Sequence, residues 1–516
     1  MRFFETDHLV SDLKTRSVRG GVAALGAQGL KLVLQLGSTV VLARLLSPRD
    51  YGVFGMAAVV TGFLGLFQDM GLSVATIQRE RITHSEVTAL FWVNSAVGLG
   101  IALLSLALAP LVAWFFGEPR LAPVVAALAL AFLLGGAAVQ HQALLRRQMR
   151  FGRLAFLETA TMLVGTAAGI GSAAAGLRYW SLVVMQLATG ASTLVLAMLL
   201  CPWLPGRPRR GADVKALVGF GAHLMGFSVV NYLGKSVDAA LLGWRWGATP
   251  VGLFGNARRL MQLPLTQISA PITQVALPAL SRIAQDPERY RAAYLRLLEK
   301  LLLLAMPGIA CLIAMSDWFV AVLLGPQWAE SGRLFAILGI AALVEPICST
   351  TGWLLISQAR AREMLFASAC DAGLRFGLVA LALPWGATGV AVAVALRLAV
   401  SAPLSLLITG RRGPVPARDM AKALVAPSAA SAAAFGAAAV VRALLGPGPA
   451  FSGLFLGSGA GAAAALAVLF VTRSGRRALR DAFASLADLR RPSPQPPSPP
   501  REEDLAAVGQ VRESRE

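Results

Sequence analysis

The chain has 516 residues, of which 56% are hydrophobic and only 14% are charged, and its mean hydropathy is +0.64. A soluble domain of this length needs far more charge on its surface, so the composition excludes a soluble globular protein. The formal net charge of +20 would suit a nucleic-acid-binding protein unless the basic residues follow a different pattern along the chain.

Long apolar segments recur along the whole sequence. A run of about 20 apolar residues crosses a hydrocarbon core of roughly 30 Å. The first run is too long for a signal peptide, so we expect it to be retained as helix 1. The predicted helices are 20–46, 52–76, 87–116, 121–144, 154–176, 180–202, 216–243, 251–281, 296–324, 333–357, 363–383, 387–409, 420–444 and 450–472. These segments predict an all-α polytopic membrane protein with about 14 transmembrane helices.

Two of the predicted helices, 20–46 and 216–243, carry the same polar pattern. Spacings of 3, 4 and 3 place four polar side chains on one helix face. These are Gln28, Lys31, Gln35 and Ser38 in the first helix, and Ser228, Asn231, Lys235 and Asp238 in the second. The following segments open with related glycine motifs, Tyr51-Gly-Val-Phe-Gly55 and Val251-Gly-Leu-Phe-Gly255. The shared register predicts two structural halves.

The basic residues gather in alternate connections between the predicted helices. Four Lys or Arg residues occur in each of the segments 146–153, 207–215, 282–296, 411–422 and 473–480, and the intervening connections hold about one each. Because cytoplasmic connections carry the excess of Lys and Arg, this pattern predicts that both termini are cytoplasmic. It also attributes the positive charge to topology and anionic lipid, and argues against a nucleic-acid partner.

Charged residues inside the predicted helices are candidates for function, because a charge at mid-membrane costs about 2.5 to 3.5 kcal/mol. They are Lys31, Arg44 and Asp69 in the first half, and Lys235, Asp238, Arg258, Arg259, Glu345, Asp371, Arg375 and Arg397 in the second. Lys235 and Asp238 are spaced for a local ion pair, as are Asp371 and Arg375. Structural ion pairs, or snorkelling to the interface, are the alternatives to a functional role.

The predicted helix 251–281 combines a polar face with regularly spaced prolines. Spacings of 3 and 4 place Arg259, Gln262, Thr266, Ser269 and Thr273 on one face. Pro264, Pro271 and Pro278 recur every seven residues on another face. Each proline removes a backbone hydrogen bond, so the helix should be curved or flexible. A moving hinge and a static bend remain as alternatives.

Other chemistry is not indicated. The four cysteines and four histidines lack metal-like spacing, and no nucleotide-binding loop occurs. We therefore expect no metal, no cofactor and no ATPase activity. Gly165-x-x-x-Gly169 and Gly457-x-x-x-Gly461 predict close helix packing. The Pro-rich stretch after residue 490 predicts a disordered tail.

Polar stripes enriched in cations on two like halves imply a central cavity that accepts an anion. A binding site at a repeat interface, exposed alternately to each side, is typical of secondary transporters. The residues alone therefore predict a transporter for an anionic substrate and no enzyme.

Several motifs, in chain order, resemble the bacterial polysaccharide transporter family. They are Ala43-Arg-Leu-Leu-Ser-Pro-Arg-Asp-Tyr-Gly52, Ala143-Leu-Leu-Arg-Arg-Gln-Met-Arg-Phe151, Val237-Asp-Ala-Ala-Leu-Leu-Gly243, Ala257-Arg-Arg-Leu-Met-Gln-Leu-Pro264 and Pro278-Ala-Leu-Ser-Arg282. The resemblance covers roughly residues 15–470. The family includes O-antigen flippases and colanic acid exporters, and its superfamily also contains multidrug and toxin extruders and the lipid II flippase.

The resemblance implies two six-helix bundles around a V-shaped cavity, with two additional helices. Placed on this chain, it predicts a cytoplasmic segment 1–19, bundles 20–202 and 216–409 joined by a cytoplasmic linker 203–215, additional helices 410–472 and a cytoplasmic tail 473–516. The implied location is the bacterial inner membrane. The implied substrate is an oligosaccharide repeat unit on polyprenyl pyrophosphate, turned from the cytoplasmic to the outer leaflet, and the polymerase and glycosyltransferases of the same pathway are the further partners we expect.

A pyrophosphate crossing the membrane needs cations in a watery cavity, and four residues are the candidates to bind it: Lys31, Lys235, Arg258 and Arg259. Gln28, Gln35, Ser38, Asn231, Gln262 and Thr266 complete the expected polar lining. We expect the lipid tail to remain in the bilayer and the halves to rock, with a hinge at the three prolines of 251–281. Asp238, Asp69 and Glu345 are the candidates for ion coupling.

Two other classes of function compete with this prediction. A multidrug extruder of the same superfamily would need a net acidic cavity, whereas the embedded charges favour Lys and Arg. A membrane glycosyltransferase or polymerase would need positioned carboxylates or histidines in a sizeable loop, and no connection here is long enough. A purely structural membrane protein would leave the polar stripes unexplained.

Overall fold

The computed structural model describes residues 13–69, 72–79, 82–207, 214–446, 448, 450–472, 475–476 and 480. Across these residues it has fourteen long helices, as predicted. They are α2 (Leu13–Leu45), α3 (Pro48–Gly65), α5 (His84–Phe116), α6 (Leu121–Arg147), α7 (Phe151–Ala174), α8 (Trp180–Leu200), α9 (Val214–Trp246), α10 (Ala248–Arg282), α11 (Pro287–Ala314), α13 (Ala329–Ser357), α14 (Ala361–Ala382), α15 (Gly386–Arg412), α17 (Val425–Leu445) and α18 (Ala450–Val471). The short elements are α4 (Leu72–Gln78), α12 (Ser316–Leu323), α16 (Ala417–Ala423) and the 3-10 turns η1 (Pro326–Trp328) and η2 (Leu383–Trp385). The all-α membrane fold is thereby confirmed.

Several predicted helices are bounded differently in the structure. The predicted helix 52–76 ends at Gly65, and α4 begins afterwards, where Asp69 accepts a hydrogen bond from the Ser73 backbone at 2.9 Å. The predicted helix 296–324 starts earlier, because Asp286 caps α11, and it stops at Ala314 before α12. Capping by Asp286 therefore sets a boundary that apolar length alone did not indicate.

The ends of the chain lie largely outside the described residues. Helix α2 begins at Leu13, inside the predicted segment 1–19, of which residues 1–12 lie outside the described part. Of the predicted linker 203–215, residues 208–213 lie outside it, and so does the predicted tail 473–516 apart from 475, 476 and 480.

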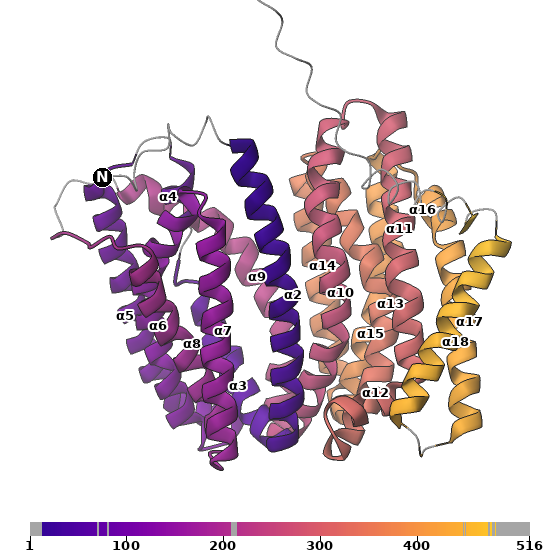
Figure 1. The fold of residues 1–516 in the computed structure, drawn as a ribbon, viewed down its shortest axis with the longest axis horizontal. Helices are drawn as coiled ribbons and strands as arrows, with labels where there is room; N and C mark the ends of the chain where they lie inside the picture. Colours follow the sequence, from indigo (N-terminus) through magenta and orange to yellow (C-terminus); the bar gives the residue numbers. More distant parts are fainter. Residues whose placement is uncertain are drawn as a thin grey trace, which may run out of the picture.

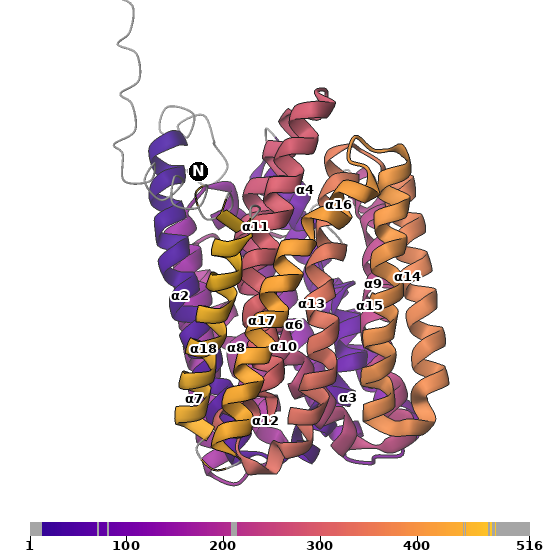
Figure 2. The same ribbon diagram turned by 90° about the vertical axis from the view of Figure 1, so that its right-hand side faces the viewer.

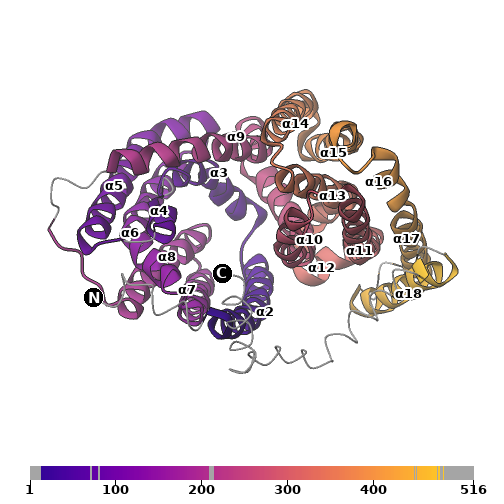
Figure 3. The same cartoon turned by 90° about the horizontal axis from the view of Figure 1, so that it is seen from above.

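The long helices form two groups that lie side by side. Figure 1 shows α2 to α8 on one side of the molecule and α10 to α18 on the other. Seen from above, α9 lies at the boundary, and it packs against α3 of the first group and α14 of the second (Figure 3). Helices α17 and α18 pack against α11 at the outer side of the second group (Figure 2). This outer packing is close, because Gly457 meets the Met315 side chain and Gly461 meets Cys311.

Hydropathy separates the outer helices from the central ones. Within the described residues, nine segments are long and apolar enough to cross a membrane. Helices α2, α9 and α10, which carry the predicted polar stripes, are not among them. The lower hydropathy of these three helices follows from their polar faces, which an apolar bilayer alone would not accommodate.

The two groups of helices meet through the duplicated glycine motifs. A Cβ atom on Gly52 would overlap the carbonyl oxygen of Ala248, and a Cβ atom on Gly252 would overlap that of Pro48. We call this backbone contact between α3 and α10 the glycine crossing. Because glycine has no side chain, the two helices can approach until their backbones touch.

Further contacts between the groups lie near the start of α3. The Ala43 carbonyl accepts hydrogen bonds from the side chains of Gln327, at 2.7 Å, and Trp328, at 2.8 Å. Arg44, one of the charged residues singled out in the sequence, donates to the Val322 carbonyl at 2.8 Å. Arg44 is therefore part of the junction between the groups.

Candidate functional site

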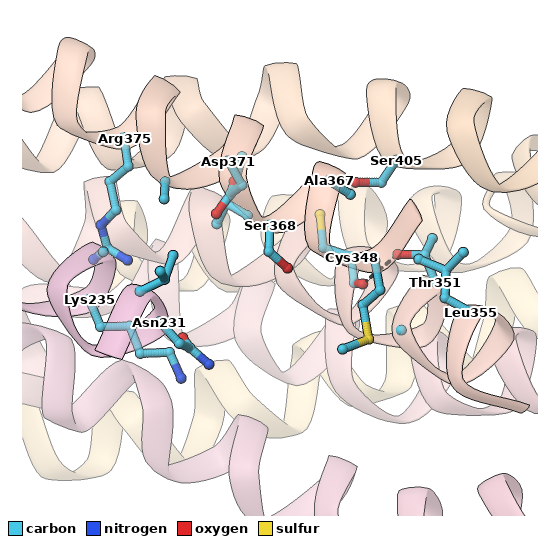
Figure 4. Close-up of a pocket in the computed structure, with 16 residues that line it drawn as sticks. Asn231, Lys235, Cys348, Thr351, Leu355, Ala367, Ser368, Asp371, Arg375 and Ser405 are labelled. Atoms are coloured by element: carbon cyan, nitrogen blue, oxygen red, sulfur yellow. Dashed lines mark hydrogen bonds between the residues drawn. The ribbon is translucent and has the colours of Figure 1, made fainter. Parts of the chain in front are cut away.

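A cavity of about 250 Å³ lies inside the second group and is lined by α9, α13, α14 and α15. Four of the predicted site residues line it: Asn231, Lys235, Asp371 and Arg375. Figure 4 shows Asn231 and Lys235, one helical turn apart on α9, and Asp371 and Arg375 on α14. We call this space the basic cavity, since Lys235 and Arg375 line it together with a single carboxylate.

A buried carboxylate organises the charges beside this cavity. Asp238 on α9 is 0% exposed and binds two arginines from different helices. Arg258 of α10 donates to Asp238 Oδ2 at 3.0 Å, and Arg375 of α14 donates to both carboxylate oxygens. Arg258 also donates to the Lys235 backbone carbonyl at 2.9 Å. The Asp238 cluster therefore joins α9, α10 and α14 and has an excess of one positive charge.

A second ion pair joins α14, which lines the cavity, to α15. Arg397 of α15 donates to the Asp371 carboxylate at 2.5 and 2.6 Å, and Ser401 donates to it at 2.7 Å. The local pairs expected from spacing, Lys235 with Asp238 and Asp371 with Arg375, were therefore wrong. Each carboxylate binds arginines from neighbouring helices, where planar guanidinium groups can meet it with two hydrogen bonds.

Because Asp238 pairs with arginines from other helices, the Lys235 ammonium can bind an anion from outside the protein. Its side chain is exposed in the basic cavity and has no ion-pair partner among the residues that the structure describes. Glu345 of α13 is partly exposed and lies within electrostatic range of Arg258 without forming an ion pair in the described structure. Counting Lys235, Arg258, Arg375 and Arg397 against Asp238, Glu345 and Asp371 gives four cations and three carboxylates. The site has a net positive charge and suits an anion.

Lys31 lies away from this cavity and has a partner that the sequence did not indicate. It forms an ion pair with Glu158 of α7. The Lys31 side chain is 22% exposed and that of Glu158 is 45% exposed. Glu158 lies within a predicted transmembrane helix, so its charge could have been noted, but its proximity to α2 depends on the packing of α2 against α7.

We expect the Lys31–Glu158 pair to contribute little stability. Both groups are partly exposed, and ion pairs that water reaches contribute about 0.2 to 1 kcal/mol. A double-mutant cycle of Lys31→Ala and Glu158→Ala, read from thermal unfolding in detergent, should give a coupling energy below about 1 kcal/mol. A coupling energy of several kcal/mol would contradict this expectation and would indicate that the pair is dry.

The remaining candidates are dispersed over the central helices. Arg259 is exposed on α10, within electrostatic range of Tyr51. Ser38 is buried and donates to the Gln35 carbonyl, Thr266 donates to that of Gln262, and Gln28 is exposed on α2. None of these six lines the basic cavity in the described structure. Asp69 is engaged by Ser73 at the start of α4. Pro264, Pro271 and Pro278 all lie within α10, which continues through them.

The cavity also contains residues that the sequence did not single out. Cys348, Thr351, Ser368 and Ser405 contribute polar or thiol groups to its wall. The Cys348 side chain is partly exposed there. Isolated Ser, Thr and Cys residues in apolar helices give no signal in a single sequence, because most of them satisfy their hydroxyls on their own helix.

Two groups of membrane-length helices, with a net positive site between α9 and the helices α13, α14 and α15, define a multi-pass membrane protein of the transporter class. A family model described as "Polysaccharide biosynthesis protein" matches residues 41–333, which is more than half of the chain. The chain therefore belongs to this family, and the resemblance drawn from its motifs is confirmed.

Individual relatives and a solved structure agree with this family. The chain is 26% identical over 354 residues to "Lipopolysaccharide biosynthesis protein WzxC" of Escherichia coli (strain K12), covering 67% of this chain and 71% of that protein. It is 26% identical over 333 residues to "Teichuronic acid biosynthesis protein TuaB" of Bacillus subtilis (strain 168), covering 64% and 68%. The structure titled "Lipid II flippase MurJ, inward closed conformation" matches with a TM-score of 0.70 at 13% identity, over 87% of this chain and 98% of that chain. The last likeness shows a shared fold.

Proposed function

We propose that this protein is a flippase that moves a polyprenyl-pyrophosphate-linked oligosaccharide across the bacterial inner membrane by alternating access. The observation that carries this proposal is the net positive site inside the membrane helices, where the Lys235 ammonium has no ion-pair partner in the described part of the chain. A diphosphate is the part of such a substrate that most needs a cation during transfer, because a charge in hydrocarbon is costly. The family and the relatives' names support a role in the export of a polysaccharide precursor.

The proposal assigns separate roles to the charged residues. Lys235 binds the diphosphate, and Arg375 and Arg258 contribute positive potential while Asp238 holds them in place. Lys31 and Arg259 contact the substrate as it leaves the cavity, since both lie on central helices. Asp238 is saturated by two guanidinium groups and serves as a structural anchor, which leaves Glu345 as the preferred carboxylate for ion coupling.

The same proposal includes topology and motion. Both termini are cytoplasmic, and the bundles 20–202 and 216–409 rock against each other with α10 bending at its prolines. The helices 410–472 stay with the second bundle, since α17 and α18 pack against α11. The polymerase and glycosyltransferases of the pathway are the proposed partners. The two relatives are named for different polymers, so the family leaves the glycan open.

Replacement of Lys235 tests the binding role directly. We expect Lys235→Gln to lower flipping of a fluorescent polyprenyl-pyrophosphate oligosaccharide in proteoliposomes by at least tenfold, because a charge-assisted bond contributes about 1.5 to 3 kcal/mol. The matched control is Lys422→Gln, which removes an exposed lysine from α16 and should leave flipping within twofold of wild type. Equal activity of the two variants would reject Lys235 as the diphosphate ligand.

Two further outcomes would reject the function itself. Export of an organic cation in exchange for protons, with no lipid flipping across several glycans, would indicate a multidrug extruder. Transfer of sugar by the purified protein would indicate an enzyme. Both assays use the same proteoliposomes, so a negative flipping result can be interpreted at once.

A further inference from the structure

A second cavity, of about 580 Å³, lies between α3, α9 and α14. None of its lining residues is charged, and apolar side chains such as Phe63, Leu233 and Phe376 form most of its wall. Its phenol, Tyr232, already donates to the carbonyls of Ala58 and Val59, at 3.0 and 3.1 Å. We call this space the apolar groove. Its other polar side chain, Ser236, is hydrogen-bonded to Tyr232, so the groove suits hydrocarbon.

Large apolar side chains of the groove are exposed at the protein surface. Leu233 is 54% exposed and Phe376 is 58% exposed, although both are large apolar side chains on membrane helices. In water such exposure would be unfavourable, whereas in a membrane these side chains meet lipid chains. A hydrocarbon chain can therefore enter the groove from the side without crossing a polar layer.

The groove adjoins the basic cavity. Val230, Gly234 and Ala372 line both spaces. A Cβ atom on Gly234 would lie 3.6 Å from the Cβ of Ala372, so the two helices meet here through small residues. On α9, Lys235 faces the basic cavity while Leu233 and Val237 face the groove. One short boundary therefore separates a site for an anion from a site for a chain.

We propose that the apolar groove holds the first isoprene units of the polyprenyl chain while the diphosphate occupies the basic cavity, with the link between them passing over Gly234 and Ala372. This inference rests on the proposed function and adds where the lipid part of the substrate lies. An amphiphile whose charged end and hydrocarbon end are joined directly needs two adjoining sites of opposite polarity, because each CH₂ group moved into water costs free energy. The basic cavity and the apolar groove are two such sites, and they adjoin at Gly234 of α9 and Ala372 of α14.

A photoreactive substrate tests the placement. The probe carries a diazirine on the isoprene units next to the diphosphate, and is irradiated with the full-length protein in proteoliposomes. We expect cross-links in the peptides that contain Leu233 and Phe376, displaced by excess unlabelled substrate. Cross-links confined to other helices would overturn the proposal, as would groove cross-links from a diazirine-bearing phosphatidylglycerol that the substrate does not displace, since bulk lipid would then be the occupant.

A matched pair of substitutions on α14 provides a second readout. Phe376→Asn places an amide in the groove, whereas Phe366→Asn alters a similarly exposed residue, 63% against 58%, that does not line it. We expect flipping to fall about tenfold in the first variant and to stay within twofold of wild type in the second. Equal flipping by both variants would overturn the groove assignment while leaving the flippase function in place. Displaceable cross-links in the groove without flipping of any glycan would overturn the flippase function while leaving the groove assignment in place.

Discussion

Replacement of Gly52 or Gly252 with alanine should prevent the glycine crossing from closing and reduce transport at least fivefold. The added Cβ would occupy the place of a backbone carbonyl on the facing helix, and a rigid backbone cannot move aside as a side chain does. Overpacking of this kind costs about 1 to 3 kcal/mol, which is enough to shift a two-state equilibrium by roughly five- to more than a hundredfold. Flipping assays and thermal unfolding of the purified variants measure the two effects.

The control for this prediction lies in the same motif. A Cβ on Gly255 meets nothing within 4 Å, so Gly255→Ala should behave as wild type in both assays. It also changes helix propensity in the same favourable direction as the test variants. Normal transport by Gly52→Ala would show that the contact between α3 and α10 is not needed in any state of the cycle.

Removal of the Asp238 carboxylate should have the largest effect on stability. In Asp238→Asn, Arg258 and Arg375 would face each other without a counter-charge in a buried position. Loss of one partner from a buried ion pair costs about 3 to 5 kcal/mol. We therefore expect a clear fall in the unfolding temperature in detergent and poor insertion or yield.

A partly exposed ion pair serves as the comparison. Asp317 pairs with Arg442, and its side chain is 50% exposed. Asp317→Asn should lower stability by less than about 1 kcal/mol, since solvent screens the remaining arginine. If Asp238→Asn proved as mild as Asp317→Asn, water would have to reach the Asp238 cluster, and its role as an anchor would be rejected.

Local patterns predicted the helices well and their charge partners poorly. The polar stripe 228–238 lies on α9, and two of its residues, Asn231 and Lys235, line the basic cavity. The stripe could be read from the sequence because a helical face depends only on spacing. The partner of Asp238 depends on how α9, α10 and α14 cross, and a residue three positions away on the same helix was the wrong choice. Lys31 and Glu158 show the same limit, since 127 positions separate two residues that meet.

The break after Gly65 illustrates a different limit. Apolar composition continues past this residue, so a single helix 52–76 was a reasonable prediction from hydropathy. A new helix, α4, begins a few residues later, and its Ser73 backbone donates a hydrogen bond to the Asp69 carboxylate. An apolar run defines how much chain can lie in the membrane, whereas the cap defines where one helix ends and another begins.

The glycine crossing has the self-complementarity of a twofold homodimer interface. Gly52 meets Ala248 and Gly252 meets Pro48, so exchange of the two halves, 200 positions apart, maps each contact onto the other. The stripe residues no longer obey this exchange: Lys31 corresponds to Asn231, Gln35 to Lys235 and Ser38 to Asp238. The chain thus keeps its pseudo-symmetry where the halves touch each other and has lost it where a substrate would be held. In this respect it is like a fused dimer in which one of two equivalent sites has become specialised.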